Sequence, residues 1–407
     1  MVYEARFLSK TYHQPLVVLA QSQKALKALR KEVANLQHGP VSVFLASVVL
    51  AAAEVLQRQF VNALIHLRGG YKVLTSSWHR SFDHGQPAKA ALCSTDSRFA
   101  VKDSIKDALY SLAQSLDLQT AWYKLFEPPE LQLIFDLAKP FPAAHDVADI
   151  RMTILSCLHG CYHFAHRAAK FKYIPLAHTP PSLTLEQSRY IAALSKCLAR
   201  IGSAPSQTTI EPTSRMFLVL RVQCLSTLIY LSTILSPYEI SYDSYTAHFQ
   251  EILTISEEIA TRFQNPIPTR SPPVFQLEPG ISQALFLTAM KCRDPYHRRR
   301  AVAMLTGIGI EGPWNARVTA WVAKRAIAVE EVGQHFQGLE SGCPTTPPET
   351  RRLHGCGLDY SAPDNASSTH LQVNFSLCRD VQRMLQASSH EDPEHWTIWT
   401  ERVEIQD

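Results

Sequence analysis

One short stretch of the chain matches a nucleotide-binding pattern. Residues 307–312 read Gly-Ile-Gly-Ile-Glu-Gly, which satisfies G-x-G-x-x-G, and Glu330 and Glu331 follow near the distance of a ribose-binding carboxylate. In dinucleotide-binding proteins a strand precedes this pattern and a helix opens at its last glycine. Here the preceding residues, HRRRAVAMLT, predict a helix, and Glu311 would place a negative charge beside the phosphates. We therefore expect a loop between two helices and no nucleotide site.

Cysteine and histidine side chains gather in one apolar stretch, at Cys157, His159, Cys161, His163 and His166. On a helix the two thiols share one face and the imidazoles can form a neighbouring stripe. Zinc accepts both ligand types, but structural zinc sites usually bring ligand pairs from separate segments, and no second pair follows at zinc-finger spacing. Buried cysteines that pack as small apolar side chains are commoner. We therefore expect no metal site and no bound cofactor.

A run of basic residues could meet phosphate or an acidic partner, and it comprises Lys291, Arg293, His297, Arg298, Arg299 and Arg300. On a helix these side chains point in different directions, and acidic residues such as Asp294 and Glu311 are near in sequence. We expect a solvated helix face laced with salt bridges. The sequence contains no G-x-S-x-G, P-loop or H-E-x-x-H pattern. We therefore predict no catalytic residues and no enzymatic activity.

The composition is that of a folded protein. Of 407 residues, 46% are hydrophobic and 19% are charged. The 40 basic residues are nearly matched by 36 acidic ones, so the net charge of +4 does not indicate nucleic-acid binding. Nine scattered cysteines indicate reduced thiols inside the cell. The apolar stretches 41–53 and 216–235 are too short or too interrupted by polar residues to span a membrane, so we expect a soluble protein with buried helices.

Helical periodicity dominates the chain. Leu26, Leu29, Val33 and Leu36 recur at spacings of three and four, which predicts an amphipathic helix. Similar patterns predict further helices over 41–57, 60–74, 98–115, 117–126, 145–171, 184–200, 212–235, 240–263, 281–306 and 313–335. Short connections favour antiparallel neighbours. The predicted fold class is all-α, a helical-repeat-like bundle of antiparallel helices with a small β-element near the C-terminus.

The character of the sequence changes near residue 341. Residues 341–368 are rich in Gly, Pro, Ser, Thr and Asp and predict a flexible loop. The segments 371–377 and 396–405 alternate apolar and polar residues, as half-exposed strands do. Polar residues interrupted by Gly and Pro at 79–96 predict another loop. We divide the chain into a helical domain (1–340) with a proline-rich connection (265–280), the loop 341–368 and a β-containing C-terminal segment (369–407).

Several segments resemble the regulatory region of fungal zinc binuclear cluster transcription factors, namely ALIHLRGGYKVL (63–74), SLDLQTAWY (115–123) and residues 291–331. A His-Leu-x-x-Gly helix is typical of that family, and His66 to Gly70 supply it here. Also typical are a Cys-Arg-Asp-Pro segment, an Arg-Arg pair and a Glu-Gly-x-Trp segment, which correspond to residues 292–295, 298–299 and 311–314. The resemblance covers most of the chain in the family's order.

The resemblance implies an all-α domain, residence in the nucleus and a part in transcriptional control, with the matching residues serving the architecture. Such factors carry two Cys-x2-Cys-x6-Cys runs whose thiolates hold two zinc ions and place a helix in the major groove. None of the nine cysteines here has that spacing, and the resemblance implies that the chain begins partway into the regulatory region. We expect a regulator that contacts other transcription regulators or the transcription machinery, without direct sequence-specific DNA binding.

Two other classes of function stay open. A helical scaffold outside transcription would have the same fold, and cytoplasmic localisation would favour it. A metal- or thiol-dependent enzyme would use the face from Cys157 to His166, and elemental analysis of the purified protein would detect its metal. A small-molecule effector and a dimer are both compatible with the sequence, which names neither target genes nor the sign of regulation.

Overall fold

The computed structural model describes most of the chain, and the ranges are 40–56, 60–82, 103–124, 128–131, 147–203, 211–263, 280–312, 314–331, 346–359, 370–387 and 389–404, with positions 24, 27, 135, 137, 275 and 276. In the region of the helix expected around Leu26 to Leu36, the structure describes only Lys24 and Lys27, and both are helical and exposed. Much of the connections predicted at 79–96 and 265–280 also lies outside the described residues.

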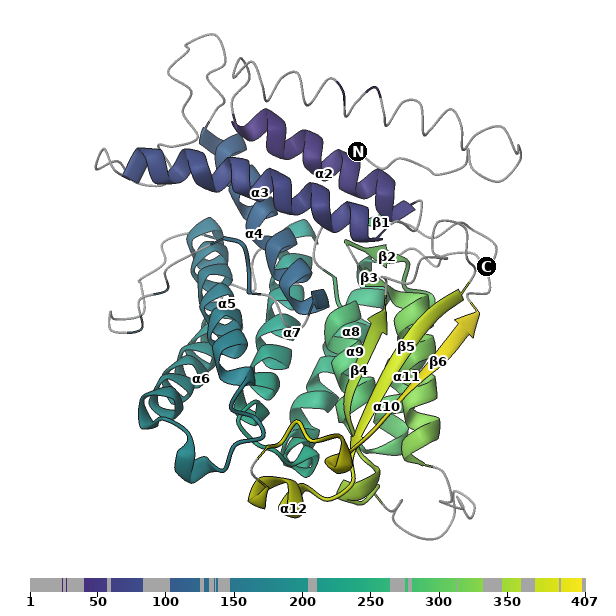
Figure 1. Ribbon diagram of the computed structural model, residues 1–407. Coiled ribbons are helices and arrows are strands. Elements are labelled where there is room, and N and C mark those ends of the chain that lie inside the picture. The colour runs from purple at the N-terminus through teal and green to yellow at the C-terminus, as the bar shows by residue number, and fades with distance from the viewer. Residues whose placement is uncertain are drawn as a thin grey trace.

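Helices make up the body of the molecule, which confirms the predicted all-α class (Figure 1). They are α2 (Pro40–Leu56), α3 (Phe60–Phe82), α4 (Asp103–Lys124), α5 (Val147–Ala169), α6 (Pro181–Gly202), α7 (Glu211–Thr233), α8 (Thr246–Phe263), α9 (Ser282–Lys291), α10 (Pro295–Gly307), α11 (Ala316–Glu330) and α12 (Val381–Gln386). The 3-10 turns are η3 (Leu176–His178), η4 (Glu239–Tyr245), η5 (Glu349–Arg351) and η6 (Pro393–His395). Helices α2 and α3 lie side by side across one end of the bundle.

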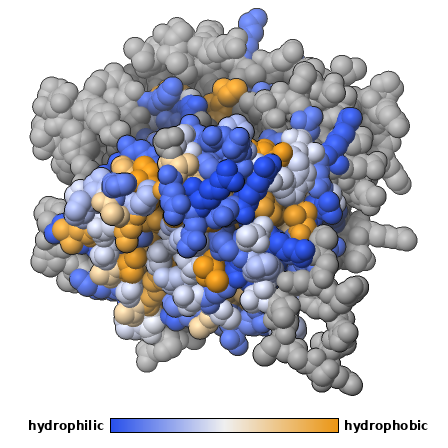
Figure 2. Space-filling view, turned by 60° about the horizontal axis from the view of Figure 1, so that its bottom comes forward, coloured by the Kyte–Doolittle hydropathy of each residue, from blue (hydrophilic) through white to orange (hydrophobic). Residues whose placement is uncertain are grey.

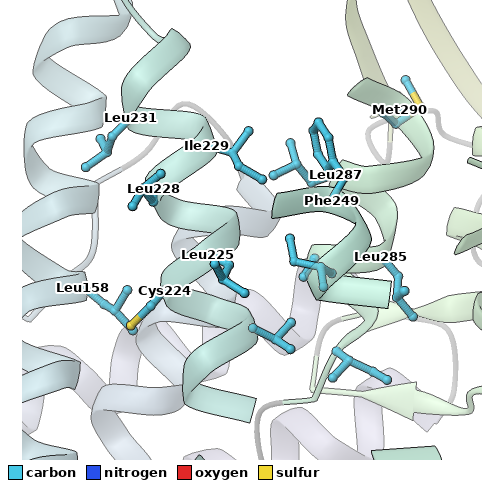
Figure 3. Close-up of a cluster of buried hydrophobic side chains, with 14 of the residues drawn as sticks. Leu158, Cys224, Leu225, Leu228, Ile229, Leu231, Phe249, Leu285, Leu287 and Met290 are labelled. Atoms are coloured by element: carbon cyan, nitrogen blue, oxygen red, sulfur yellow. The ribbon is translucent and has the colours of Figure 1, made fainter. Parts of the chain in front are cut away.

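Helix α7 lies in the core of the bundle. Leu228 and Leu231 point to one side of it, while Ile229 points to the other, toward Phe249 and Leu287 (Figure 3). By length and composition α7 could cross a membrane, but 72% of its most apolar window is buried inside the protein. Apolar side chains on several faces are expected for a helix with neighbours all round it. The prediction of a buried core helix over this stretch is therefore confirmed.

Several helix boundaries differ from the sequence-based prediction, among them that of 240–263, where residues up to Tyr245 form η4 and α8 begins at Thr246. Helix α3 continues to Phe82, four residues into the predicted loop at 79–96. A single helix, α4, replaces the two predicted over 98–115 and 117–126, and Asp117 at the predicted break is buried and accepts the Leu131 N–H at 2.8 Å. The helix predicted over 281–306 is two helices, because Pro295 starts α10 and Asp294 caps it, accepting the His297 N–H at 2.8 Å.

Two small sheets complete the fold. The first joins the two-residue strands β1 (Phe275–Gln276), β2 (Ile310–Glu311) and β3 (Trp314–Asn315). The second is antiparallel, in the order β4 (Leu353–Asp359), β5 (His370–Cys378) and β6 (Trp396–Glu404), and lies beside α11 (Figure 1). Strands predicted over 371–377 and 396–405 are thus confirmed as β5 and β6.

The flexible loop predicted over 341–368 is wrong for residues 346–359, which contain η5 and β4. Glycine disfavours strands, so Gly355 and Gly357 hide the pattern in the sequence. A Cβ at Gly355 would lie 2.5 Å from the Ser376 Oγ of β5. This strand therefore depends on close pairing with β5, a contact distant in sequence.

Candidate functional site

Two carboxylates are wholly buried where α11 ends and η4 begins. Glu330 accepts hydrogen bonds from Arg293 Nη2 and from Arg298 Nη2, both at 2.8 Å. Glu239 accepts from Lys172 Nζ at 2.8 Å and Lys291 Nζ at 2.6 Å. Arg293 Nη2 also lies 3.7 Å from the Glu239 carboxylate, which links the two groups. We call these six residues the ionic cluster: Lys172, Glu239, Lys291, Arg293, Arg298 and Glu330.

The electrostatics of the ionic cluster favour its charged state. Burial raises the pKa of Glu239, but Lys172, Lys291 and Arg293 outweigh burial and hold that pKa below its usual value. Burial likewise raises the pKa of Glu330, and the two arginines bring it below the usual value. Both carboxylates are therefore ionised anchors for cations, and neither is poised to act as a general acid near neutral pH.

The two lysines of the ionic cluster differ, because the pKa of Lys291 is below the usual lysine value and that of Lys172 is above it. Burial lowers the pKa of Lys291 to about 8, although Glu239 acts in the opposite direction. A lysine with such a pKa can serve as a nucleophile or base when its amine is free. Here Nζ donates to Glu239, to the Leu353 carbonyl at 3.1 Å and to the His354 carbonyl at 3.5 Å. All three N–H donors are used, so Lys291 fixes the chain segment of β4.

The local sequence around α9 and α10 brings these cations together. The chain leaves helical geometry at Cys292 and restarts at Pro295, so Lys291 and Arg293 lie at a helix junction. On α10, Arg298 shares a face with the buried residues Ala301, Val302 and Leu305, at spacings of three and four. That face packs toward α9 and α11. The Arg298 guanidinium therefore enters the core with the apolar stripe.

The solvated helix face predicted for the basic run is only half right. Arg299 and Arg300 do pair near the surface, with Glu331 and Glu257. Arg293 and Arg298, however, are 3% and 0% exposed, so the prediction is wrong for both. Their partner is Glu330, which is distant in sequence, and not the nearby Asp294 and Glu311 that the sequence suggested. Burial of a guanidinium needs such a partner because an unpaired charge is costly in the interior.

A second set of charges joins the C-terminal sheet to the helices. Arg352 is 1% exposed and binds both carboxylate oxygens of Asp243 at 2.7 Å. Glu349 accepts the backbone N–H groups of Glu239 and Ile240 at 2.6 and 2.8 Å. The Leu353 N–H donates to Glu330 at 2.8 Å. These bonds fasten the start of β4 to η4 and α11.

Residues of the stretch 307–312 contact the start of α9 and the side chain of Gln119 on α4. Helix α10 ends at Gly307, so a helix precedes the glycine pattern, as predicted. The next α-helix, α11, begins at Ala316 and not at Gly312. The Glu311 carboxylate accepts the Ser282 N–H at 2.8 Å at the start of α9, so it occupies a helix N-terminus where a phosphate would sit. Gly312 has φ of +54°, and a Cβ there would lie 2.2 Å from the Gln119 Oε1. The glycine serves a turn against α4.

The cysteines of α5 lie in the hydrophobic core, as their apolar surroundings predicted. Cys157 and Cys161 are 0% exposed, and Cys197 of α6 and Cys224 of α7 belong to the same buried cluster. The sequence did not reveal the last two as neighbours, because they come from other helices. Among the residues that the structure describes, no group of three or more His, Cys, Asp or Glu could hold a metal ion.

The histidines of α5 take separate partners. His159 Nε2 bonds the Gln114 carbonyl of α4 at 3.1 Å, and its Nδ1 lies 3.8 Å from the carboxylate of Asp117. His163 Nε2 bonds the Leu131 carbonyl at 3.0 Å, and His166 is exposed. Burial lowers the pKa of His159 to about 3 and raises that of Asp117 to about 7. At most 1% of either side chain is exposed, so the pair cannot reach a substrate in this conformation.

One described surface is hollowed next to the ionic cluster. An open groove of about 560 Å³ runs between α10 and α11, and its lining residues are Arg299, Val302, Ala303, Thr306, Lys324, Ile327, Ala328 and Glu331. On the face shown in Figure 2, apolar residues form several separate small groups among hydrophilic ones. The groove combines an apolar floor with charged side chains, which suits a protein segment better than a small reacting molecule.

Comparison with known proteins finds no family model, curated protein or solved structure that matches the chain.

Proposed function

We propose that the chain is a transcription-regulatory domain of the fungal zinc-cluster factor type, which acts through protein–protein contacts without a zinc cluster of its own. It works in the nucleus, where other transcription regulators or the transcription machinery are its partners. The proposal rests on the family-like segments of the sequence, and the positions of their residues in the fold support it.

The observation that carries the proposal is that several of these family-like residues have structural roles, either in the interior or at a helix start. Arg293 and Arg298 hold Glu330, and Asp294 caps α10. Gly70 lies against α2, where a Cβ would be 2.8 Å from the Ser47 Cβ. Trp314 is 5% exposed. Residues that stabilise the fold in this way suit a regulatory domain, since its partners bind a surface whose shape the buried residues maintain.

The proposed partner surfaces are the groove between α10 and α11 and the proline-rich segment 265–280. Extended or amphipathic segments of a partner dock on such features through apolar anchors and main-chain hydrogen bonds. The groove adjoins the ionic cluster, because its lining residue Glu331 lies 3.7 Å from the guanidinium of Arg298. A rigid floor of this kind lowers the ordering cost of binding.

DNA retention at physiological salt tests the proposal. The purified chain is passed over immobilised DNA alone and after mixing with fungal nuclear extract, with extract lacking the chain as the blank. We expect retention only in the presence of extract, with zinc-cluster factors co-eluting, because the chain relies on a partner's DNA contact. Tight sequence-specific retention of the chain alone would contradict the indirect mode, and absence of retention in both conditions would refute the proposal.

A further inference from the structure

Strand β6 forms one edge of the C-terminal sheet, at the outer margin of the molecule (Figure 1). Its inner edge pairs with β5 along its whole length, from His370 opposite Glu404 to Cys378 opposite Trp396. Among the described residues, no segment pairs with its outer edge. An edge strand presents a row of N–H and C=O groups that can add another strand.

The two faces of β6 differ. Trp399 stacks on the buried ring of Phe375 with centroids 5.3 Å apart, and Glu401 binds Arg325 of α11 at 2.6 and 2.9 Å. Because side chains alternate along a strand, Ile398, Thr400 and Arg402 lie on the opposite face. All three are exposed, and Ile398 is 67% exposed. A large apolar side chain therefore stands on the outer face beside the unpaired edge.

The sequence of β6 allows two copies to pair without placing like charges opposite each other. Its first half, Trp396–Trp399, is uncharged, and its charged residues are Glu401, Arg402 and Glu404. Antiparallel pairing of two copies about Thr400 overlaps all nine residues. That register sets Ile398 opposite Arg402 of the other copy and Trp396 opposite Glu404, so every charge meets an uncharged side chain. Registers centred on Glu401 or on Arg402 would oppose like charges, which destabilises a strand pair.

We propose that β6 pairs with β6 of a second copy of this chain, which joins two three-stranded sheets into one sheet of six strands. The interface is a symmetric strand pair about a two-fold axis at Thr400, the commonest symmetry of homodimers. Each Ile398 packs its side chain on the aliphatic part of Arg402 from the other copy. This dimer is independent of the proposed function in transcription.

The mass of the full chain in solution, measured by size-exclusion chromatography with light scattering, tests the pairing. We expect a dimer for the wild type. Ile398→Lys opposes a positive charge to Arg402 at two symmetry-related places, so the dimer Kd rises by about tenfold. The double variant Ile398→Lys/Arg402→Glu makes these pairs attractive and restores the dimer. Leu176→Lys is the matched control, since Leu176 is 68% exposed in η3, and it leaves the dimer unchanged.

Two results would overturn the pairing. A wild-type chain that stays monomeric at its highest soluble concentration shows that the edge does not join two copies, and a foreign extended segment then becomes the occupant to seek. A dimer that Ile398→Lys leaves intact shows that another surface holds the copies together. Circular dichroism of each variant confirms that a change in mass does not come from unfolding.

Discussion

Single residues of the basic run show what spacing can and cannot reveal. Arg298 and Arg299 are adjacent, yet one is wholly buried and the other is at the surface. The burial of Arg298 could have been predicted from the sequence, because Arg298 continues the apolar stripe of Ala301, Val302 and Leu305 at helical spacing. The identity of its partner was not available, because Glu330 lies on another helix and nothing local links the two.

Removal of one buried charge should be costly. Glu330→Gln leaves Arg293 and Arg298 buried without a compensating charge, so we expect the free energy of unfolding to fall by about 3–5 kcal/mol. Urea denaturation measures it. The control is Glu258→Gln, which breaks an exposed pair with Arg262 on one helix face and should change stability by less than about 1 kcal/mol. Equal losses in the two variants would contradict the anchoring role of Glu330.

The buried histidine of α5 should make stability depend on pH. His159 binds a proton near pH 6.5 when unfolded but only at about 3 when folded, because it is buried. Between these values the unfolded state holds more protons, so stability falls as the pH falls. Asp117, with its pKa raised to about 7, acts in the opposite direction, since the folded state holds its proton.

His159→Gln isolates this effect. Relative to the wild type, the slope of unfolding free energy against pH between pH 6 and 4 should decrease by about 1.4 kcal/mol per pH unit. Chemical denaturation at a series of pH values gives both slopes. Parallel slopes for wild type and variant would mean that His159 gains its proton equally in both states, against its buried position.

At the scale of elements, two adjacent glycines of α3 have different roles. A Cβ at Gly70 would lie 2.8 Å from the Ser47 Cβ and 3.3 Å from the Phe44 ring, whereas a Cβ at Gly69 meets nothing within 4 Å. Helical geometry turns only one of the two glycines toward α2. Gly70 therefore sets the distance between α2 and α3.

Alanine at these two positions should have opposite effects. Gly70→Ala forces α2 and α3 apart and should destabilise the protein by about 1–3 kcal/mol. Gly69→Ala gains helix propensity without a clash and should stabilise it by up to about 1 kcal/mol. Thermal unfolding of the two variants side by side gives the comparison. Stabilisation by Gly70→Ala would show that the two helices are not in close contact.

Long helices could be predicted from the sequence, and their junctions could not. Apolar periodicity located α2, α5, α6 and α11, because it reflects a buried face that each helix carries by itself. It missed the break at Cys292–Asp294 and the continuity of α4, where buried polar residues such as Asp117 bond to other segments. Strand β4 was missed for the same reason, since Gly355 is held in the strand by its pairing with Ser376 of β5. Tertiary partners decided each of these points.

At the scale of the whole molecule, charged contacts hold the C-terminal sheet on the bundle. Arg352 contributes two bonds to Asp243 and one to the Pro347 carbonyl at 2.8 Å. Arg352→Met should lower the free energy of opening of β4 and β5 by about 2 kcal/mol, while α7 and α8 keep their protection. Hydrogen exchange detects the difference. Arg325→Met, which breaks the more exposed pair with Glu401, is the control and should affect the sheet less. Uniform loss of protection along the chain would contradict a local clamp.

The buried charged residues of the family-like segments form a framework, and we propose that partners bind the surface that this framework holds in place. The triple variant Arg293→Met/Arg298→Met/Glu330→Gln removes the charges together and keeps an acceptor for the Leu353 N–H, so it should fold with near wild-type stability. The decisive measurement is its retention on DNA in the presence of nuclear extract. We expect the same retention as for the wild type. A folded triple variant that is no longer retained, beside a retained wild type, would contradict the claim and assign the buried charges a direct part in function.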